Sequence, residues 1–181
     1  VIPQIDPEKC IECHRCVQGC PENHVKEKHE PRQCYAAWQK DRKERKYSAS
    51  GGIAFGFYKR WIQNAGIVYG AAFNEKGILT QQKAETLEEI KKFRGSKYAQ
   101  SHTGFVYSDI GKELKKGEKV LFIGTPCQIA GLKAYLGKAS DALVTIDLIC
   151  HGTPPMSYLE EYIKEIAGAE KVDRVSFRGE K

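Results

Sequence analysis

The stretch that indicates the fold of this chain is Val120-Leu121-Phe122-Ile123-Gly124-Thr125-Pro126-Cys127-Gln128. Its four leading apolar residues predict a buried strand over 120–123, and the turn after them opens a helix over 128–136 that Gly137 ends. The next apolar run predicts a second strand over 143–149, and 156–166 an amphipathic helix. Strands that alternate with helices predict an α/β fold, a largely parallel sheet flanked by helices.

The rest of the chain after about residue 50 follows the same alternation. Thr86 and Glu89 have the spacing of a capping box, which begins a helix with reciprocal side-chain to backbone hydrogen bonds. The other predicted elements are a helix over 53–62, strands over 67–73 and 78–82, a helix over 106–114 and a last strand over 172–177.

Composition places the chain among globular proteins. It has 181 residues, of which 41% are hydrophobic and 29% charged, and its mean hydropathy is −0.51. No apolar run approaches the roughly 20 residues that a membrane span needs, and no signal-peptide pattern begins the chain. We therefore expect a cytoplasmic protein that does not associate with a membrane. The chain contains seven cysteines, four of them within residues 10–20, which suits metal ligation better than disulfides.

The net charge of the chain says less about its binding partners. The net charge is +6, and its densest run, residues 40–46, mixes both signs without regularly interleaved aromatic residues. We therefore expect a solvated face and no nucleic acid. Docking of an acidic partner or cofactor is the second interpretation of this run.

The strongest chemical motif is the cysteine run in the first part of the chain. Cys10, Cys13, Cys16 and Cys20 stand in a C-x2-C-x2-C-x3-C-P pattern that ends at Pro21. Zinc modules pair two separated C-x2-C knuckles, whereas this run is typical of a [4Fe-4S] cluster. The sequence thus predicts a ferredoxin-like iron-sulfur segment over 1–33, followed by an α/β domain over 34–181.

The fourth ligand of this cluster has two candidate sources. In two-cluster ferredoxins the last cysteine of a run ligates the other cluster, and only one run is present here. Either Cys20 or Cys34 completes the site of Cys10, Cys13 and Cys16, or an upstream cysteine does. We favour the upstream source.

Two further cysteines follow the predicted strands. Cys127 stands at a helix N-terminus, and Cys150 follows the next strand, so adjacent parallel strands would bring both to one edge of the sheet. Such an edge is where ligands collect in open parallel sheets. Burial as two small apolar side chains is an equally weighted alternative.

Two segments are candidates for a phosphate-bearing ligand. Ser50, Gly51 and Gly52 precede a helix, whose free amides suit an anion, although a simple cap and turn gives the same pattern. Lys97 and Tyr98 combine a cation with an aromatic face, as an ordinary surface loop also does. Neither segment is a G-x-G-x-x-G fingerprint.

Together these motifs resemble the coenzyme F420 hydrogenase/dehydrogenase beta-subunit family of iron-sulfur flavoproteins. The resemblance extends over the motifs 48–52, 68–73, 96–98, 124–128, 147–152 and 175–178. It implies FAD and [4Fe-4S] clusters, with Cys127 and Cys150 as ligands of the cluster beside the flavin. It also implies that the cofactor-binding residues are Ser50, Gly51, Gly52, Lys97, Tyr98 and Thr125.

The implied function is an oxidoreductase that passes electrons between [4Fe-4S] clusters, FAD and a substrate or a deazaflavin such as F420. A redox partner protein, either a ferredoxin or another subunit, would exchange these electrons. The alternative is a ferredoxin-like electron-carrier subunit without catalysis. Family members have another cysteine run upstream and a C-x-x-C pair downstream, so we expect this chain to be a piece of a longer protein.

Overall fold

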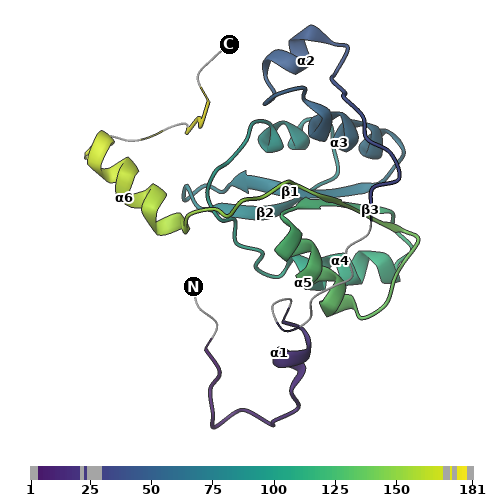
Figure 1. The fold of residues 1–181 in the computed structure, drawn as a ribbon, viewed down its shortest axis with the longest axis vertical. Coiled ribbons are helices and arrows are strands. Elements are labelled where there is room, and N and C mark those ends of the chain that lie inside the picture. Colours follow the sequence, from purple (N-terminus) through teal and green to yellow (C-terminus); the bar gives the residue numbers. More distant parts are fainter. Residues whose placement is uncertain (1–3, 21–22, 24–29, 169–171, 173–174, 179–181) are drawn as a thin grey trace.

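A four-stranded mixed sheet forms the centre of the chain (Figure 1). The computed structural model describes residues 4–20, 23, 30–168, 172 and 175–178. The strand order is β2-β1-β3-β4, with β1 parallel to β3, β3 parallel to β4, and β2 antiparallel to β1. The bounds are Ile67–Phe73 for β1, Leu79–Ala84 for β2, Val120–Gly124 for β3 and Leu143–Asp147 for β4.

Helices cover both faces of this sheet (Figure 1). On one face Phe55 and Tyr58 pack against Val68 and Leu121. On the other face the helices pack against the alternate residues of the same strands, such as Phe122. The first face is covered by α3 (Ile53–Gln63) and the short 3-10 helix η1 (Glu89–Phe93), the second by α4 (Val106–Lys115) and α5 (Pro126–Leu136).

Burial on both faces explains the apolar run that indicated the fold. All five residues of β3 are buried. Because β3 lies between two strands and two helical layers, both of its faces need apolar side chains. By contrast β4 has β3 as a neighbour on one side only, and each of its residues is either partly buried or exposed.

The antiparallel strand β2 arises from a tight connection. The side chain of Asn74 accepts hydrogen bonds from the backbone amides of Lys76 and Ile78, both at 3.0 Å. These bonds close a short turn between β1 and β2, and a short turn joins antiparallel strands. The sheet is therefore largely but not wholly parallel, as predicted.

Three short or peripheral helices complete the described structure. They are α1 (Arg15–Gln18), α2 (Arg42–Lys46) and α6 (Met156–Ala167). In Figure 1 α2 lies above α3, α1 lies beyond α4 and α5 on the other side of the sheet, and α6 projects away from the body. No helix of the described residues is long and apolar enough to span a membrane.

Most predicted elements are confirmed, with shifted ends. The capping box forms, since Glu89 N donates to Thr86 Oγ1 at 3.2 Å and Thr86 N donates to Glu89 Oε2 at 3.1 Å, but a 3-10 helix follows it. Three predictions were wrong in extent by two residues at one end. The strand predicted over 78–82 runs from Leu79 to Ala84. The helix predicted from Gln128 begins at Pro126, and the strand predicted over 143–149 ends at Asp147, where its partner β3 also ends.

The predicted strand over 172–177 is wrong for the residues that the structure describes. Residues 173 and 174 lie outside the described part. Val172, Val175, Ser176 and Phe177 belong to no strand, because they pair with no neighbouring strand. A strand is stable only through such a ladder of hydrogen bonds.

Substitution of one glycine of β1 tests how α3 packs on the sheet. A Cβ at Gly70 would lie 2.3 Å from the hydroxyl oxygen of buried Tyr58. We expect Gly70→Ala to lower the free energy of unfolding by about 1–3 kcal/mol, since overpacking strains a full core. Urea denaturation measures this change.

The matched control is a glycine in the middle of α4. At Gly111 a Cβ would lie 3.5 Å from Leu136 Cδ2, an ordinary contact. Gly111→Ala should raise the free energy of unfolding by about 0.5–1 kcal/mol, because alanine favours helix more than glycine does. Equal effects of the two substitutions would contradict the packing described for Tyr58.

Candidate functional site

The carboxyl ends of β3 and β4 lie side by side and form the edge on which the candidate site is built. Gly124 at the end of β3 pairs with Asp147 at the end of β4, and Leu148 N donates to Gly124 O at 2.9 Å. In α/β proteins ligands bind at this edge of the parallel strands. The next residues of the chain after β3 are the start of α5.

Gln128 holds the start of α5 in place. Its side-chain oxygen accepts from Thr125 N and from Gln81 Nε2, both at 3.1 Å, and its side-chain nitrogen donates to Ser101 O at 3.1 Å and Ser101 Oγ at 2.9 Å. Gln128 is buried, so these bonds satisfy a polar group that water does not reach. They join α5 to β2 and to the loop that contains Ser101.

Cys127 lies one residue before Gln128 and is exposed. Its sulfur is 3.1 Å from Thr125 Oγ1. The first turn of α5 presents backbone amides and the positive end of the helix dipole at this position. Of the two alternatives, burial of Cys127 as a small apolar side chain is wrong.

Cys127 and Cys16 line the same cavity, which has a volume of about 1220 Å³. The cavity lies between α1, α4, α5 and the start of α6, and its lining includes the aromatic residues Tyr107 and Tyr135. Tyr107 donates from its hydroxyl to Gln128 O at 2.8 Å, and burial, reinforced by Cys127, raises the pKa of Tyr107 to about 12. A cysteine from the ferredoxin-like run thus lies at the same cavity as a cysteine from the sheet edge.

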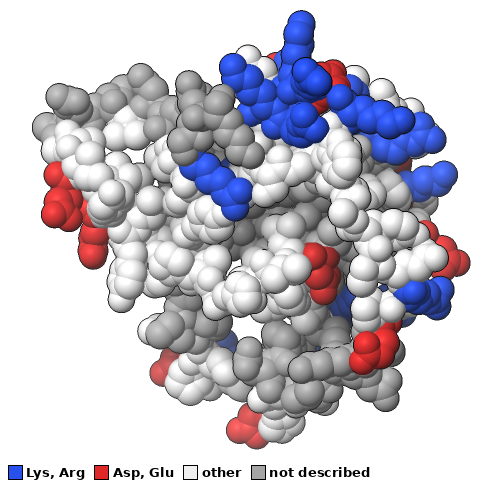
Figure 2. All heavy atoms as spheres, turned by 45° about the horizontal axis from the view of Figure 1, so that its top comes forward, with Lys and Arg blue, Asp and Glu red and all other residues white. Residues whose placement is uncertain are grey.

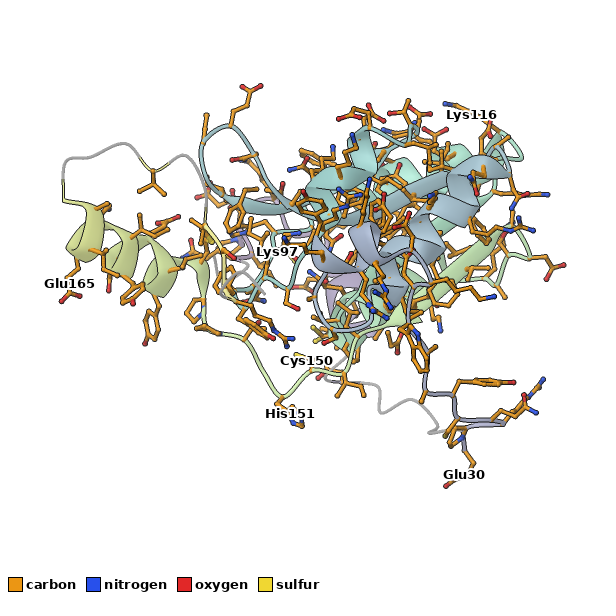
Figure 3. All side chains as sticks on the ribbon, turned by 90° about the horizontal axis from the view of Figure 1, so that it is seen from above. Glu30, Lys97, Lys116, Cys150, His151 and Glu165 are labelled. Atoms are coloured by element: carbon orange, nitrogen blue, oxygen red, sulfur yellow. The ribbon has the colours of Figure 1, made fainter. Side chains whose placement is uncertain are left out.

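Cys150 is exposed and lies outside that cavity. Figure 3 shows Cys150 and His151 on the segment that leads from β4 to α6. The sulfur of Cys150 accepts a hydrogen bond from Gly152 N at 3.3 Å. The strand ends of Cys127 and Cys150 are adjacent as the sequence suggested, while only Cys127 faces the cavity.

The cysteine run has an exposed donor set. Cys10, Cys13 and Cys16 are exposed, and Cys20 is half-buried. Glu12 and His14, which flank Cys13, have positive φ angles of 51° and 55°. Such bends are uncommon for these residue types and turn the chain sharply between successive cysteines.

The thiols of the run fit an iron-sulfur cluster by chemistry and spacing. In the part of the chain that the structure describes, no three metal-binding side chains converge on one point. Five cysteines lie in residues 1–57, namely Cys10, Cys13, Cys16, Cys20 and Cys34. This number suffices for the four ligands of one cluster but not for the eight of two.

A second group of candidate residues meets near the start of α3. Arg178 donates from Nε to the hydroxyl of Tyr98 at 3.0 Å and from Nη1 to Ser50 Oγ at 3.1 Å. The hydrogen bond from Arg178 lowers the pKa of Tyr98. The structure thus brings together Ser50 and Tyr98, which the sequence analysis singled out separately, and adds Arg178. Only the closing motif 175–178 pointed to this arginine.

The two glycines after Ser50 have structural reasons of their own. A Cβ at Gly51 would lie 2.6 Å from Ala37 O, so the backbone of 37–38 passes too close for a side chain. Gly52 has φ 72° and forms the N-cap of α3, a left-handed conformation that favours glycine. No side chain caps α3, which leaves its first amides suited to an anion.

The side chain of Lys97 forms hydrogen bonds within the protein. Its ammonium group donates to Lys92 O at 3.1 Å and Arg94 O at 2.9 Å, at the end of η1. Burial lowers the pKa of Lys97 to about 8. Its observed contacts are therefore those of a side chain that caps a short helix.

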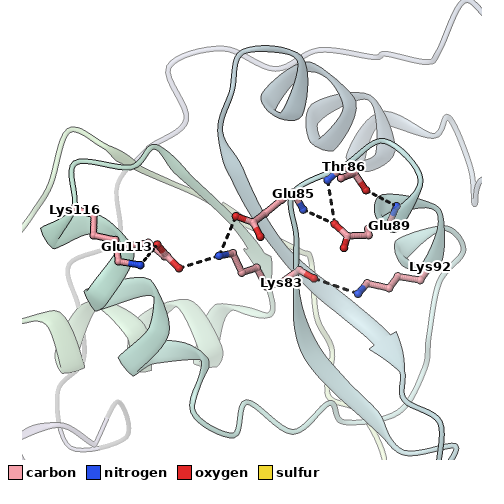
Figure 4. Close-up of polar contacts among 7 residues, drawn as sticks. All are labelled: Lys83, Glu85, Thr86, Glu89, Lys92, Glu113 and Lys116. Carbon is pink, nitrogen blue, oxygen red and sulfur yellow. Dashed lines mark hydrogen bonds and ion pairs between the residues drawn. The ribbon is translucent and has the colours of Figure 1, made fainter.

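A separate ion-pair network joins β2 to α4 (Figure 4). Lys83 lies 2.9 Å from Glu113 and 3.1 Å from Glu85, and Glu113 also contacts Lys116 at 3.1 Å. Burial opposes the charge of Lys83, but hydrogen bonds to Glu113 and Glu85 outweigh it and raise its pKa. None of these residues lines the cavity, so the network is structural.

Comparisons with known proteins agree with this arrangement. Residues 117–181 match the family described as the C terminus of the coenzyme F420 hydrogenase/dehydrogenase beta subunit, and residues 2–57 match the 4Fe-4S dicluster domain. A solved structure of the F420-reducing [NiFe] hydrogenase complex from Methanosarcina barkeri contains a similar chain, with a TM-score of 0.55 and 20% identity. The similarity covers 74% of this chain and 49% of that chain, so this chain spans about half its length. No curated protein sequence matches.

The fold and the cysteine run define an α/β protein with an iron-sulfur segment. The last part of the chain, residues 117–181, is similar to the coenzyme F420 hydrogenase/dehydrogenase beta-subunit family, and the first part, residues 2–57, is similar to 4Fe-4S dicluster domains. The solved structure, at 20% identity, shows the fold alone.

The network around Gln128 gives a stability prediction. Gln128→Leu would leave the amide of Thr125 without its partner and the side chain of Gln81 with Ser101 Oγ alone, and we expect the free energy of unfolding to fall by roughly 2–3 kcal/mol. Ser101→Ala removes a hydroxyl that accepts from Gln128 and Gln81, but each donor keeps another acceptor, so the substitution should cost about 1 kcal/mol. Urea denaturation of both variants checks the ranking, and the reverse ranking would contradict it.

Lys97 gives a pH prediction. Above pH 8 the folded chain releases the proton of Lys97, while the unfolded chain keeps it up to about pH 10.5. The unfolded state then binds more protons, so this lysine makes the free energy of unfolding rise with pH between 8 and 10.5. The difference between the natural chain and Lys97→Met should show this rise, by up to about 1 kcal/mol per pH unit. A flat difference over this range would refute the buried ammonium.

Proposed function

We propose that the chain is the electron-transferring part of an iron-sulfur flavoprotein oxidoreductase. In this proposal residues 1–33 carry a [4Fe-4S] cluster, residues 34–181 carry the flavin site, and electrons pass to a substrate or a deazaflavin such as F420. When bound, the flavin would exchange two electrons and each cluster one. A redox partner protein, a ferredoxin or another subunit, would supply or accept them.

The observation that carries the proposal is the shared cavity of Cys16 and Cys127. Cys16 belongs to the run that would hold a cluster with Cys10 and Cys13, and Cys127 follows the central strand. A short distance between redox groups favours transfer, and this cavity brings the two cysteine motifs to one place. Cys127 and Cys150 remain the proposed ligands of the cluster beside the flavin, and Thr125 orients the first of them through its hydroxyl.

Support for a flavin comes from the group at the start of α3. Ser50, Tyr98 and Arg178 place two hydroxyls and a cation beside an uncapped helix N-terminus, which suits the phosphates of a dinucleotide. The arginine would neutralise an anion, and Gly51 and Gly52 shape the turn that leads into the helix. The match of residues 117–181 to the coenzyme F420 hydrogenase/dehydrogenase beta-subunit family supports the same assignment.

A second candidate function is a ferredoxin-like electron-carrier subunit without a catalytic site. Two observations favour it: the space beside Gly51 is filled by the protein's own backbone, and Lys97 already bonds two carbonyl groups. Bound flavin distinguishes the two functions.

The deciding measurement is the content of iron, zinc and flavin per chain after purification without oxygen, with absorption spectra before and after dithionite. About four irons and a bleachable shoulder near ~400 nm, together with flavin, would support the flavoprotein. Iron without flavin would favour the carrier. Zinc without iron would overturn both.

Variants of the run locate the ligands. Cys13→Ala should lose most of the iron, because it removes one of three thiolates that wrap the cluster. Cys34→Ala should retain the iron, since we expect the fourth ligand from an upstream cysteine. Iron analysis of both variants checks this, and loss of iron in Cys34→Ala would instead make Cys34 the fourth ligand.

A further inference from the structure

The most concentrated positive charge of the described chain surrounds α2. Figure 2 shows Lys and Arg side chains gathered at this end of the molecule. We call this region, residues 40–47 with Trp38, the α2 surface. Within the described residues none of its cations forms an ion pair, and they are Lys40, Arg42, Lys43, Arg45 and Lys46.

The two acidic residues of the α2 surface are engaged by the fold. Asp41 caps α2 by accepting from Lys43 N at 2.8 Å and Glu44 N at 3.3 Å. Glu44 pairs inward with Arg94, whose guanidinium carbon lies 4.2 Å from the ring centroid of Phe55. Asp41 thus stabilises α2 itself and Glu44 holds α2 on the body, and among the described residues neither carboxylate pairs with a cation of the α2 surface.

On other helices of the chain, lysines form ion pairs with nearby carboxylates. Lys91, Lys112 and Lys116 each pair with a carboxylate three residues earlier. On α2, by contrast, Arg42 and Lys46 are like charges four residues apart, an arrangement that destabilises a helix. The last turn of α2 gains some stability from Lys43, Arg45 and Lys46 through the helix dipole, but Lys40 and Arg42 lie outside that turn. A binding role accounts for the whole cluster better than a structural one.

The neighbouring aromatic residues indicate the class of partner. Trp38 is 61% exposed and Tyr47 65% exposed. Exposed Trp, Tyr and Arg side chains in one place are typical of the residues that dominate protein interfaces. With five residues α2 is only about 7.5 Å long, which gives a compact patch and not a groove that follows a nucleic-acid backbone.

We infer that the α2 surface docks an acidic protein that exchanges electrons with this chain. The segment after α2 leads within a few residues to Ser50, so a docked partner would lie beside the group of Ser50, Tyr98 and Arg178. The redox nature of the partner rests on the proposed function. The inference that the partner is acidic depends only on the cations of the α2 surface.

The test measures binding of an acidic bacterial [4Fe-4S] ferredoxin to the full chain by calorimetry at about 20 mM and 200 mM salt. The test variant is Lys43→Glu with Lys46→Glu, two exposed side chains without hydrogen bonds to described residues. The control is Lys133→Glu with Lys138→Glu, which makes the same change of net charge at the other face of the sheet.

We expect the test variant to weaken binding at least about tenfold at low salt, the control less than about twofold, and high salt to reduce the difference. Equal weakening in both variants, or no binding by the natural chain, would overturn the inference. Tighter binding of a DNA duplex with the same dependence on Lys43 and Lys46 would also overturn it. Iron and flavin contents of the same preparations report separately on the proposed function.

Discussion

The parallel pairing of β3 with a strand on each side is the constraint on which the rest of the structure depends. Val120 pairs with Ile67 of β1 and with Leu143 of β4, and every residue of β3 is buried. Parallel neighbours require crossover connections, and the helices α4 and α5 of those connections cover one face of the sheet, while α3, which precedes β1, covers the other together with η1. The same pairing brings the ends of β3 and β4 to one edge, where Cys127 follows.

Gln128 fixes the start of α5, and with it the candidate site, relative to the sheet. Its four side-chain hydrogen bonds reach β2, the loop of Ser101 and the amide that begins α5. Because these bonds are buried, the start of α5 has one position relative to the sheet. Cys127 and the cavity wall formed by Tyr107 are therefore placed by the core of the domain and not by a free loop.

The candidate residues form two groups. Cys16 and Cys127 lie with α1, α4 and α5, while Ser50, Tyr98 and Arg178 lie at the start of α3 beside the α2 surface. In the proposed function the first group belongs to the clusters and the second to the flavin. The α2 surface then provides a docking place for a charged partner beside the second group.

The sequence by itself determined the elements whose signals are local. Runs of apolar residues predicted β1 and β3, Gly137 ended α5, and the spacing of Thr86 and Glu89 predicted a capping box that forms. Tertiary structure alone decided where β4 stops and which distant residues meet. β4 ends with its partner, and Arg178 reaches Tyr98 and Ser50 from 80 and 128 residues away. Such contacts depend on how the elements pack, and no local periodicity records that packing.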